Sequence, residues 1–101
     1  MSLLTKPRTL AGITGTRPMR RVLLALLTDA TNLSGLILSQ LAGISPARVY
    51  ICLDQLELEG WITGTWQNAP YPRRRFYQLT PAGWSNAYEL LGLDRSEARR
   101  G

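Results

Sequence analysis

The chain has 101 residues, of which 45% are hydrophobic and 19% charged, so it can build one packed domain but not two. It contains no histidine and one cysteine, which excludes the usual zinc ligand sets, Ser-His-Asp or Cys-His catalysis and an internal disulfide. The net charge is +5, and a basic balance favours a polyanionic partner. We therefore expect a binding protein without a cofactor rather than an enzyme.

No pattern for export or membrane insertion is visible in the sequence. The longest strongly apolar run, residues 22–27, is far shorter than the ~20 residues that span a bilayer. No charged segment precedes a long apolar one, as it does in a signal peptide. Because the single cysteine also shows no disulfide framework, we expect a cytoplasmic protein without a membrane partner.

The first part of the chain is basic. Residues 1–28 carry five bases and no acid. Within them, residues 1–16 mix threonine, glycine and bases without a sustained period, so we expect a basic arm that is mobile unless a partner holds it. Such an arm can lie in a minor groove, pack on a partner or stay disordered.

Two helical patterns open the domain that follows, which we place at residues 17–92. Pro18 suits a first helical turn, and apolar residues at one-face spacing predict a helix over about 18–28. A second apolar pattern predicts a short helix over about 33–41, and Gly43 stands where a left-handed cap would end it.

A third helix is predicted after a tight turn. Ser45 supplies a side-chain cap, and Pro46 loses no hydrogen bond at a first helical position. We expect the helix to run over about 46–59 and to stop at Gly60. Its apolar positions fall within one sector of a helical wheel and are Val49, Cys52, Leu53 and Leu56.

The composition then becomes typical of strands. Residues 61–66 and 73–80 predict two strands, joined by a polar loop that contains prolines. Thr80 and Pro81 repeat the cap-plus-proline pattern and predict a fourth helix that ends at Gly92. Its expected apolar stripe consists of Trp84, Ala87, Tyr88 and Leu91. Residues 93–101 form a polar tail.

The order of these elements predicts a winged helix-turn-helix. The fold class is mainly α with a small β-hairpin: a three-helix core, a two-stranded wing and a C-terminal helix. In this layout the third helix can enter a DNA major groove, and the hairpin can reach a neighbouring groove.

Two segments also resemble the PadR-type winged helix-turn-helix transcriptional regulators. They are S-P-A-R-V-Y at residues 45–50 and R-R-R-F-Y-Q-L-T-P-A-G at residues 73–83, and the resemblance covers about residues 19–83. It implies double-stranded DNA as the partner, with Tyr50 in contact with the DNA backbone. Members usually carry a longer C-terminal helical region for dimerisation than the about 20 residues that follow Thr80 here.

We expect the outer surface of the third helix to contact DNA. Ala47 and Ile51 can meet thymine methyl groups, Arg48 can bind O6 and N7 of guanine, and the Tyr50 hydroxyl can donate to a phosphate. The alternatives are that Arg48 is merely solvated, that Tyr50 edges the core and that Ile51 packs on a partner. The predicted DNA-binding residues of this helix and the wing are Ser45, Ala47, Arg48, Tyr50, Ile51, Arg73, Arg74 and Arg75.

The three arginines of the second wing strand cannot all point the same way. Strand alternation puts Arg75 on the face of Tyr77 and Leu79, and Arg74 on the opposite face. Only some of them can therefore reach a phosphate or a minor groove. The alternative is an ordinary solvated run of charges.

These expectations combine into a sequence-specific DNA-binding transcriptional repressor that acts as a homodimer on half-sites about one turn apart. The apolar positions left for a dimer interface are Trp84, Tyr88, Leu91 and Leu93. One alternative is a protein-binding adaptor that uses Ile51, Leu58 and the aromatic wing. A second is an architectural or recombination accessory protein that bends DNA. A further alternative is an aromatic pocket that binds a planar small-molecule effector.

Overall fold

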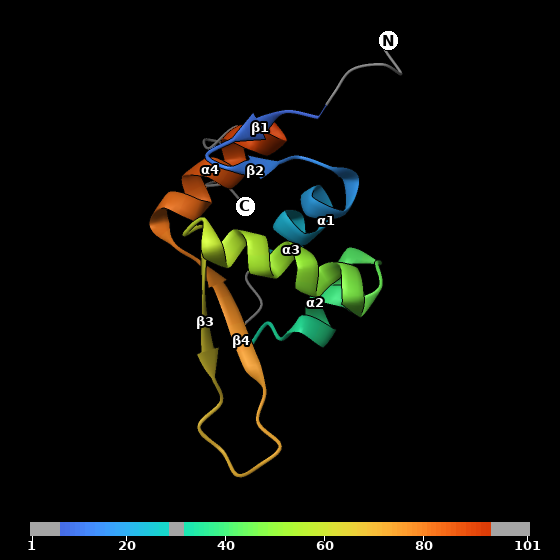
Figure 1. Ribbon diagram of the computed structural model, residues 1–101, viewed down its shortest axis with the longest axis vertical. Helices are drawn as coiled ribbons and strands as arrows, with labels where there is room; N and C mark the ends of the chain where they lie inside the picture. Colours follow the sequence, from blue (N-terminus) through green and yellow to red (C-terminus); the bar gives the residue numbers. More distant parts are fainter. Residues whose placement is uncertain (1–6, 29–31, 94–101) are drawn as a thin grey trace.

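The computed structural model describes residues 7–28 and 32–93 and contains four helices and two small hairpins within them. In chain order the elements are β1 (Thr9–Leu10), β2 (Ile13–Thr14), α1 (Arg17–Leu26), α2 (Gly35–Ala42), α3 (Pro46–Leu58), β3 (Ile62–Trp66), β4 (Arg75–Leu79) and α4 (Pro81–Leu91). Figure 1 shows α1, α2 and α3 gathered together, with the β3–β4 hairpin extending away from them. This is the predicted winged helix-turn-helix.

Side-chain caps start each of the four helices. Hydroxyl oxygens of Thr16, Ser34, Ser45 and Thr80 accept a hydrogen bond from the backbone N–H three residues later. These bonds satisfy amides that a helix start leaves without an intrahelical partner. The caps of α3 and α4 were predicted, whereas those of α1 and α2 were not.

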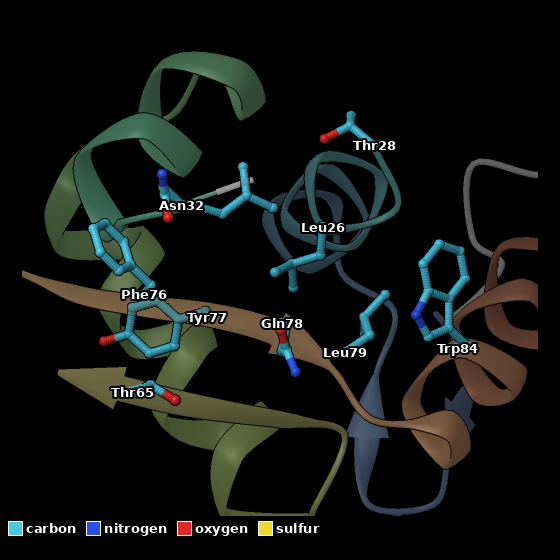
Figure 2. A pocket seen from close by; sticks show the side chains of 10 residues that line it. Leu26, Thr28, Asn32, Thr65, Phe76, Tyr77, Gln78, Leu79 and Trp84 are labelled. Atoms are coloured by element: carbon cyan, nitrogen blue, oxygen red, sulfur yellow. The ribbon is translucent and has the colours of Figure 1, made fainter. Parts of the chain in front are cut away.

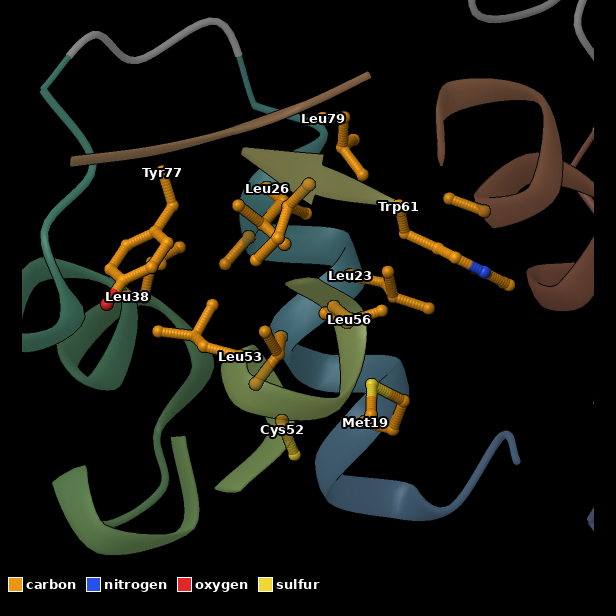
Figure 3. Close-up of a cluster of buried hydrophobic side chains, with 14 of the residues drawn as sticks. Met19, Leu23, Leu26, Leu38, Cys52, Leu53, Leu56, Trp61, Tyr77 and Leu79 are labelled. Carbon is orange, nitrogen blue, oxygen red and sulfur yellow. The ribbon is translucent and has the colours of Figure 1, made fainter. Parts of the chain in front are cut away.

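One hydrophobic core joins the three helices to the sheet. Figure 3 shows Leu23 and Leu26 of α1 packed with Leu53 and Leu56 of α3, and Trp61 belongs to the same cluster. The four residues of the predicted α3 stripe are all buried. Truncating a fully buried leucine such as Leu53 costs about 2–5 kcal/mol in such cores. The buried stripe therefore determines which surface of α3 faces outward.

The wing is an antiparallel pair whose register runs from Ile62 opposite Leu79 to Trp66 opposite Arg75. A single β-bridge between Ser34 and Phe76 ties the segment before α2 to β4. The Tyr77 amide also donates to the Leu33 carbonyl at 2.9 Å. The base of the wing is thereby attached to the helix-turn-helix, while its loop extends beyond it (Figure 1).

Part of the segment expected to be a basic arm forms the β1–β2 hairpin. Ile13 is buried at 1% exposure, the Trp61 indole donates to the Ala11 carbonyl at 3.2 Å, and Arg8 donates to the Glu89 carbonyl at 3.0 Å. Strands of two residues are too short to produce a detectable sequence period. Residues 1–6 of the expected arm lie outside the described residues.

The buried faces of α2 and α4 differ in detail from the sequence patterns. Leu36 and Leu41 of α2, which belonged to the apolar pattern, are exposed. On α4 the buried residues are Gly83, Ala87 and Leu90, so Ala87 of the predicted stripe is buried, whereas Trp84, Tyr88 and Leu91 are only partly buried. A short helix in a small domain has apolar residues on more than one side, so the wheel alone does not choose the buried one.

Among the described residues no single helix is long and apolar enough to cross a bilayer, and only α2 and α3 counted together, across a bend of 111°, reach that length and composition.

Candidate nucleic-acid interface

The outer face of α3 is unobstructed. Ala47 and Arg48 are exposed, and Ile51 is 61% exposed, while the opposite face of the helix is in the core. Ser45 is exposed as well, but its hydroxyl accepts from the Arg48 amide at 3.4 Å, so its direct structural role is the helix cap. An apolar side chain such as Ile51 that the described residues leave uncovered is accessible to a partner.

Tyr50 lies on one flank of α3 and packs over the start of α2. A Cβ built on Gly35 would come within 2.5 Å of the Tyr50 ring, so the absence of a side chain at Gly35 lets the ring lie there. Tyr50 is nevertheless 46% exposed. One side of Tyr50 therefore edges the core, as one of the alternatives held, and the other side faces solvent.

A groove of about 400 Å³ separates this flank from the wing. It is lined by Ser34, Gly35, Leu36, Tyr50, Trp66, Arg73, Arg74, Arg75 and Tyr77. The start of α2 and three arginines thus border the same hollow. Backbone N–H groups at a helix start and guanidinium groups both bind phosphate oxygens.

The wing arginines differ in their surroundings. Arg73 and Arg74 are exposed. Arg75 is partly buried, forms an ion pair with Glu57 of α3, and lies over the rings of Trp66 at 5.4 Å and Tyr77 at 5.9 Å. The expected strand alternation is confirmed, since Tyr77 and Leu79 are buried on the same face as Arg75. Arg75 therefore links the wing to α3, and Arg73 and Arg74 are the freer of the three cations.

The other flank of α3 carries Arg48. With about 100° between successive residues, Arg48 falls on the side opposite Tyr50. There it lines a smaller hollow of about 320 Å³ with Arg17, Pro18, Arg21 and Ile44. Basic side chains thus lie on both sides of the outer face of α3.

The four residues predicted for a dimer interface lie along α4 and just after it. Trp84 and Leu91 are half-buried and pack against the core, and the Trp84 and Tyr88 rings are 5.7 Å apart at 48°. Leu93 is 42% exposed. Leu93 is therefore accessible to a partner, whereas Trp84 and Leu91 already pack partly against the core of the same chain.

A further hollow, of about 530 Å³, lies beside β4. Figure 2 shows Leu26 and Leu79 between Trp84 on one side and the Phe76 and Tyr77 rings on the other. Thr28 and Asn32 also line it. We assign no ligand to it.

Burial changes the pKa of two groups near these surfaces. It raises the pKa of the Cys52 thiol. It also raises the pKa of the Tyr77 phenol, against an opposing effect of the Arg75 guanidinium. Both groups therefore stay protonated at neutral pH. Within residues 7–28 and 32–93 no three His, Cys, Asp or Glu side chains gather as metal ligands.

Several residues around α3 were not singled out by the sequence analysis. Gly35 and Trp66 line the wing groove, and Arg17 and Arg21 line the hollow beside Arg48. The Ser34-Gly35 pair is a recognisable helix start and could have indicated the first of these. The arginines were visible only as part of a basic segment, since no sequence pattern relates α1 to the start of α3.

Comparison with known proteins gives consistent results. The family model for the transcriptional regulator PadR-like family matches residues 24–89, which is more than half of the chain. A search with this chain found no match among the curated protein sequences.

Solved structures with the same fold include regulators of the MarR family. A MarR family transcriptional regulator from Silicibacter pomeroyi is 25% identical with a TM-score of 0.59, over 84% of this chain and 58% of that one. ZitR of Lactococcus lactis in complex with DNA is 19% identical with a TM-score of 0.61, over 99% and 64%. PcaV of Streptomyces coelicolor, in complex with its natural ligand, is 18% identical with a TM-score of 0.66, over 88% and 62%.

The chain spans about three fifths of the length of these neighbours, and at such identities the two latter show the fold alone. The family match and the winged-helix architecture agree in the segment that contains the helix-turn-helix and the wing. The chain therefore belongs to the PadR-like family of transcriptional regulators, whose members are regulators and not enzymes.

Proposed function

We propose that the chain is a sequence-specific double-stranded DNA-binding repressor of transcription. The N-terminal half of α3 enters the major groove, and the wing lies on the DNA backbone or in the minor groove. Arg73, Arg74 and Tyr50 contact phosphates, which supplies affinity, while Ala47 and Ile51 contact base edges, which supplies discrimination.

The observation that carries this proposal is the exposure of Ala47, Arg48 and Ile51 on a helix whose other face is in the core. An α-helix fits a major groove about 12 Å wide, provided that its outer side is free. The basic groove between Tyr50 and the wing adds the phosphate-binding chemistry. ZitR of Lactococcus lactis, one of the structural neighbours, is in complex with DNA.

The direct test is selection of bound sites from randomised duplexes, followed by titration of the selected site and a scrambled duplex at several salt concentrations. We expect a recurrent motif and an affinity that falls steeply as salt rises, because bound phosphates release counterions. Failure to enrich any motif, together with binding that ignores salt, would contradict the proposal.

Two variants separate affinity from discrimination. Ile51→Ala should lower the ratio of the affinity for the selected duplex to the affinity for the scrambled duplex, because it removes a contact to a base edge. Arg74→Ala should weaken binding to both duplexes alike, because a phosphate contact carries no sequence information. Both side chains are exposed, so thermal unfolding should change little and serves as the control for folding.

We also propose that the protein acts as a homodimer through the α4 surface. The rings of Trp84 and Tyr88 and the exposed Leu93 supply apolar area there. Two such protomers would read half-sites about one helical turn apart. Sedimentation equilibrium of the wild type and of Tyr88→Glu tests this idea: the wild type should be dimeric and the variant shifted toward monomer. A wild type that stays monomeric at high concentration would contradict it.

A second candidate function is a protein-binding adaptor, which the exposure of Leu58 favours. Leu58 is 83% exposed and lies on α3 about two helical turns after the exposed Ile51. The salt dependence decides between the two, because an apolar protein contact would not weaken steeply with rising salt. If Ile51→Ala and Arg74→Ala leave the affinity for every duplex unchanged, the adaptor is favoured.

A further inference from the structure

The starts of α1 and α3 form a second basic surface, separate from the wing groove. Arg17 and Arg21 of α1 and Arg48 of α3 line one hollow of about 320 Å³, together with Pro18 and Ile44. All three charged residues of the lining are cationic. A concave surface whose charged residues are all cations has the electrostatics of an anion site.

The three guanidinium groups differ in their contacts with the rest of the protein. Arg21 donates to the Ala42 carbonyl at 3.2 Å and so is held in place. Arg17 and Arg48 are exposed, and across the described part of the chain neither guanidinium has a hydrogen-bond or ion-pair partner. Two free cations thus lie beside one that is already oriented by the protein.

This arrangement is unfavourable without an anion. Arg17 is the first residue of α1, and Arg48 is in the first turn of α3. The partial positive charge at a helix start disfavours a cation there. Like charges around one hollow also repel each other. A phosphate group bound between them would offset both effects and accept several charge-assisted hydrogen bonds.

The position of the hollow relative to α3 indicates which phosphate this is. Tyr50 and the wing groove lie on one flank of the helix, and Arg48 with its two neighbours lies on the other. Figure 1 shows α1 on the opposite side of α3 from the wing loop. A helix in the major groove has one DNA backbone on each side. The residues that line the wing groove can contact only the DNA backbone on their own side of α3.

We propose that Arg17, Arg21 and Arg48 bind a phosphodiester of the DNA strand that borders the major groove on the side away from the wing. The inference rests on the proposed function, and it assigns to α1 a part in DNA binding. It also gives Arg48 a phosphate as its partner, in place of the guanine that the sequence suggested.

The first experiment compares Arg17→Gln with Arg20→Gln. Both changes remove one positive charge from the same helix, but Arg20 points to α4, where it donates to the Leu90 carbonyl at 3.4 Å. We expect Arg17→Gln to reduce the slope of log affinity against log salt by about 0.9, which is the contribution of one phosphate. The loss of affinity should be roughly tenfold at about 0.1 M salt and equal for selected and scrambled duplexes. Arg20→Gln should leave the slope unchanged.

A second experiment locates the phosphate. Methylphosphonate linkages, which are neutral, are placed one at a time in the selected duplex. We expect one linkage that weakens binding of the wild type more than it weakens binding of Arg17→Gln, because the variant has already lost one of the three cations that contact this phosphate. Arg48→Gln should show the same reduced sensitivity to that linkage. Circular dichroism of each variant confirms that the fold is intact.

The outcomes are distinguishable. If the wild type binds duplexes with a steep salt slope, but Arg17→Gln and Arg20→Gln behave alike and no linkage is coupled to Arg17, the phosphate contact is wrong while the proposed function stands. If the wild type binds no duplex, the proposed function fails and this inference with it. Stabilisation of the wild type by inorganic phosphate, lost in Arg17→Gln without any change in the DNA salt slope, would show a site for a free anion and overturn the proposal.

Discussion

Glu57 of α3 and Arg75 of β4 form an ion pair that ties α3 to the wing. The side chains are 35% and 27% exposed, respectively. The Arg75 guanidinium also lies over the rings of Trp66 and Tyr77. The pair therefore sets the position of the wing strand relative to α3, although it lies too near solvent to contribute strongly to stability.

A double-mutant cycle with Glu57→Gln and Arg75→Gln measures this link. Each single change should lower the free energy of unfolding by about 1 kcal/mol or less, and the coupling between them should be about 0.2–1 kcal/mol. Urea unfolding of the four proteins gives these values. Asp54→Asn is the matched control, since it removes an exposed carboxylate from the same helix. A coupling well above 2 kcal/mol would show that the pair is a buried structural element instead.

Gly83→Ala should be strongly destabilising. A Cβ at this position would lie 1.9 Å from the Trp61 carbonyl oxygen, and that oxygen already accepts from the Thr80 amide at 2.9 Å. Because the obstacle is backbone, α4 must move, at a cost of about 1–3 kcal/mol or more. Thermal unfolding measures the loss, and Ala82→Ser, at an exposed neighbouring position, should leave the midpoint nearly unchanged. An equally stable Gly83→Ala protein would contradict this packing of α4 on the wing base.

Tyr77 should make the protein lose stability at alkaline pH. Burial raises the pKa of its phenol above the value of about 10 in the unfolded chain. The unfolded state therefore loses its proton first, so the contribution of Tyr77 is fully present below pH ~10 and is lost as the pH rises through the folded pKa. Tyr77→Phe removes this titration, so its free energy of unfolding should fall less between about pH 9 and 11. Tyr71→Phe changes a position that is 85% exposed, so its free energy of unfolding should fall with pH as much as that of the wild type.

Cys52 should be unreactive in the folded protein. Its side chain is 6% exposed, and burial raises the pKa of the thiol, so both access and thiolate formation are suppressed. A disulfide reagent such as Ellman's reagent should react slowly at neutral pH and rapidly once urea unfolds the chain. Fast labelling of the folded protein would indicate that the inner face of α3 opens readily. Cys52→Ala should keep the fold but lose some stability, because it removes buried volume.

Local chemistry made much of the fold predictable from the sequence. Ser45-Pro46 and Thr80-Pro81 identified two helix starts that the structure confirms, and Gly43 and Gly92 identified two helix ends with left-handed caps. The spacing of Val49, Cys52, Leu53 and Leu56 determined the buried face of α3. Caps, stops and periodic stripes act over a few residues, so the sequence contains them directly.

The tertiary structure alone decided which side chains of different elements meet. It placed Arg75 against Glu57 rather than free on the wing, put Tyr50 over Gly35, and brought Arg17 and Arg21 beside Arg48. It also turned residues 9–14 into a hairpin that holds the Trp61 indole. These contacts depend on how three helices and a sheet pack around a shared core, and packing of elements distant in sequence leaves no local period to detect.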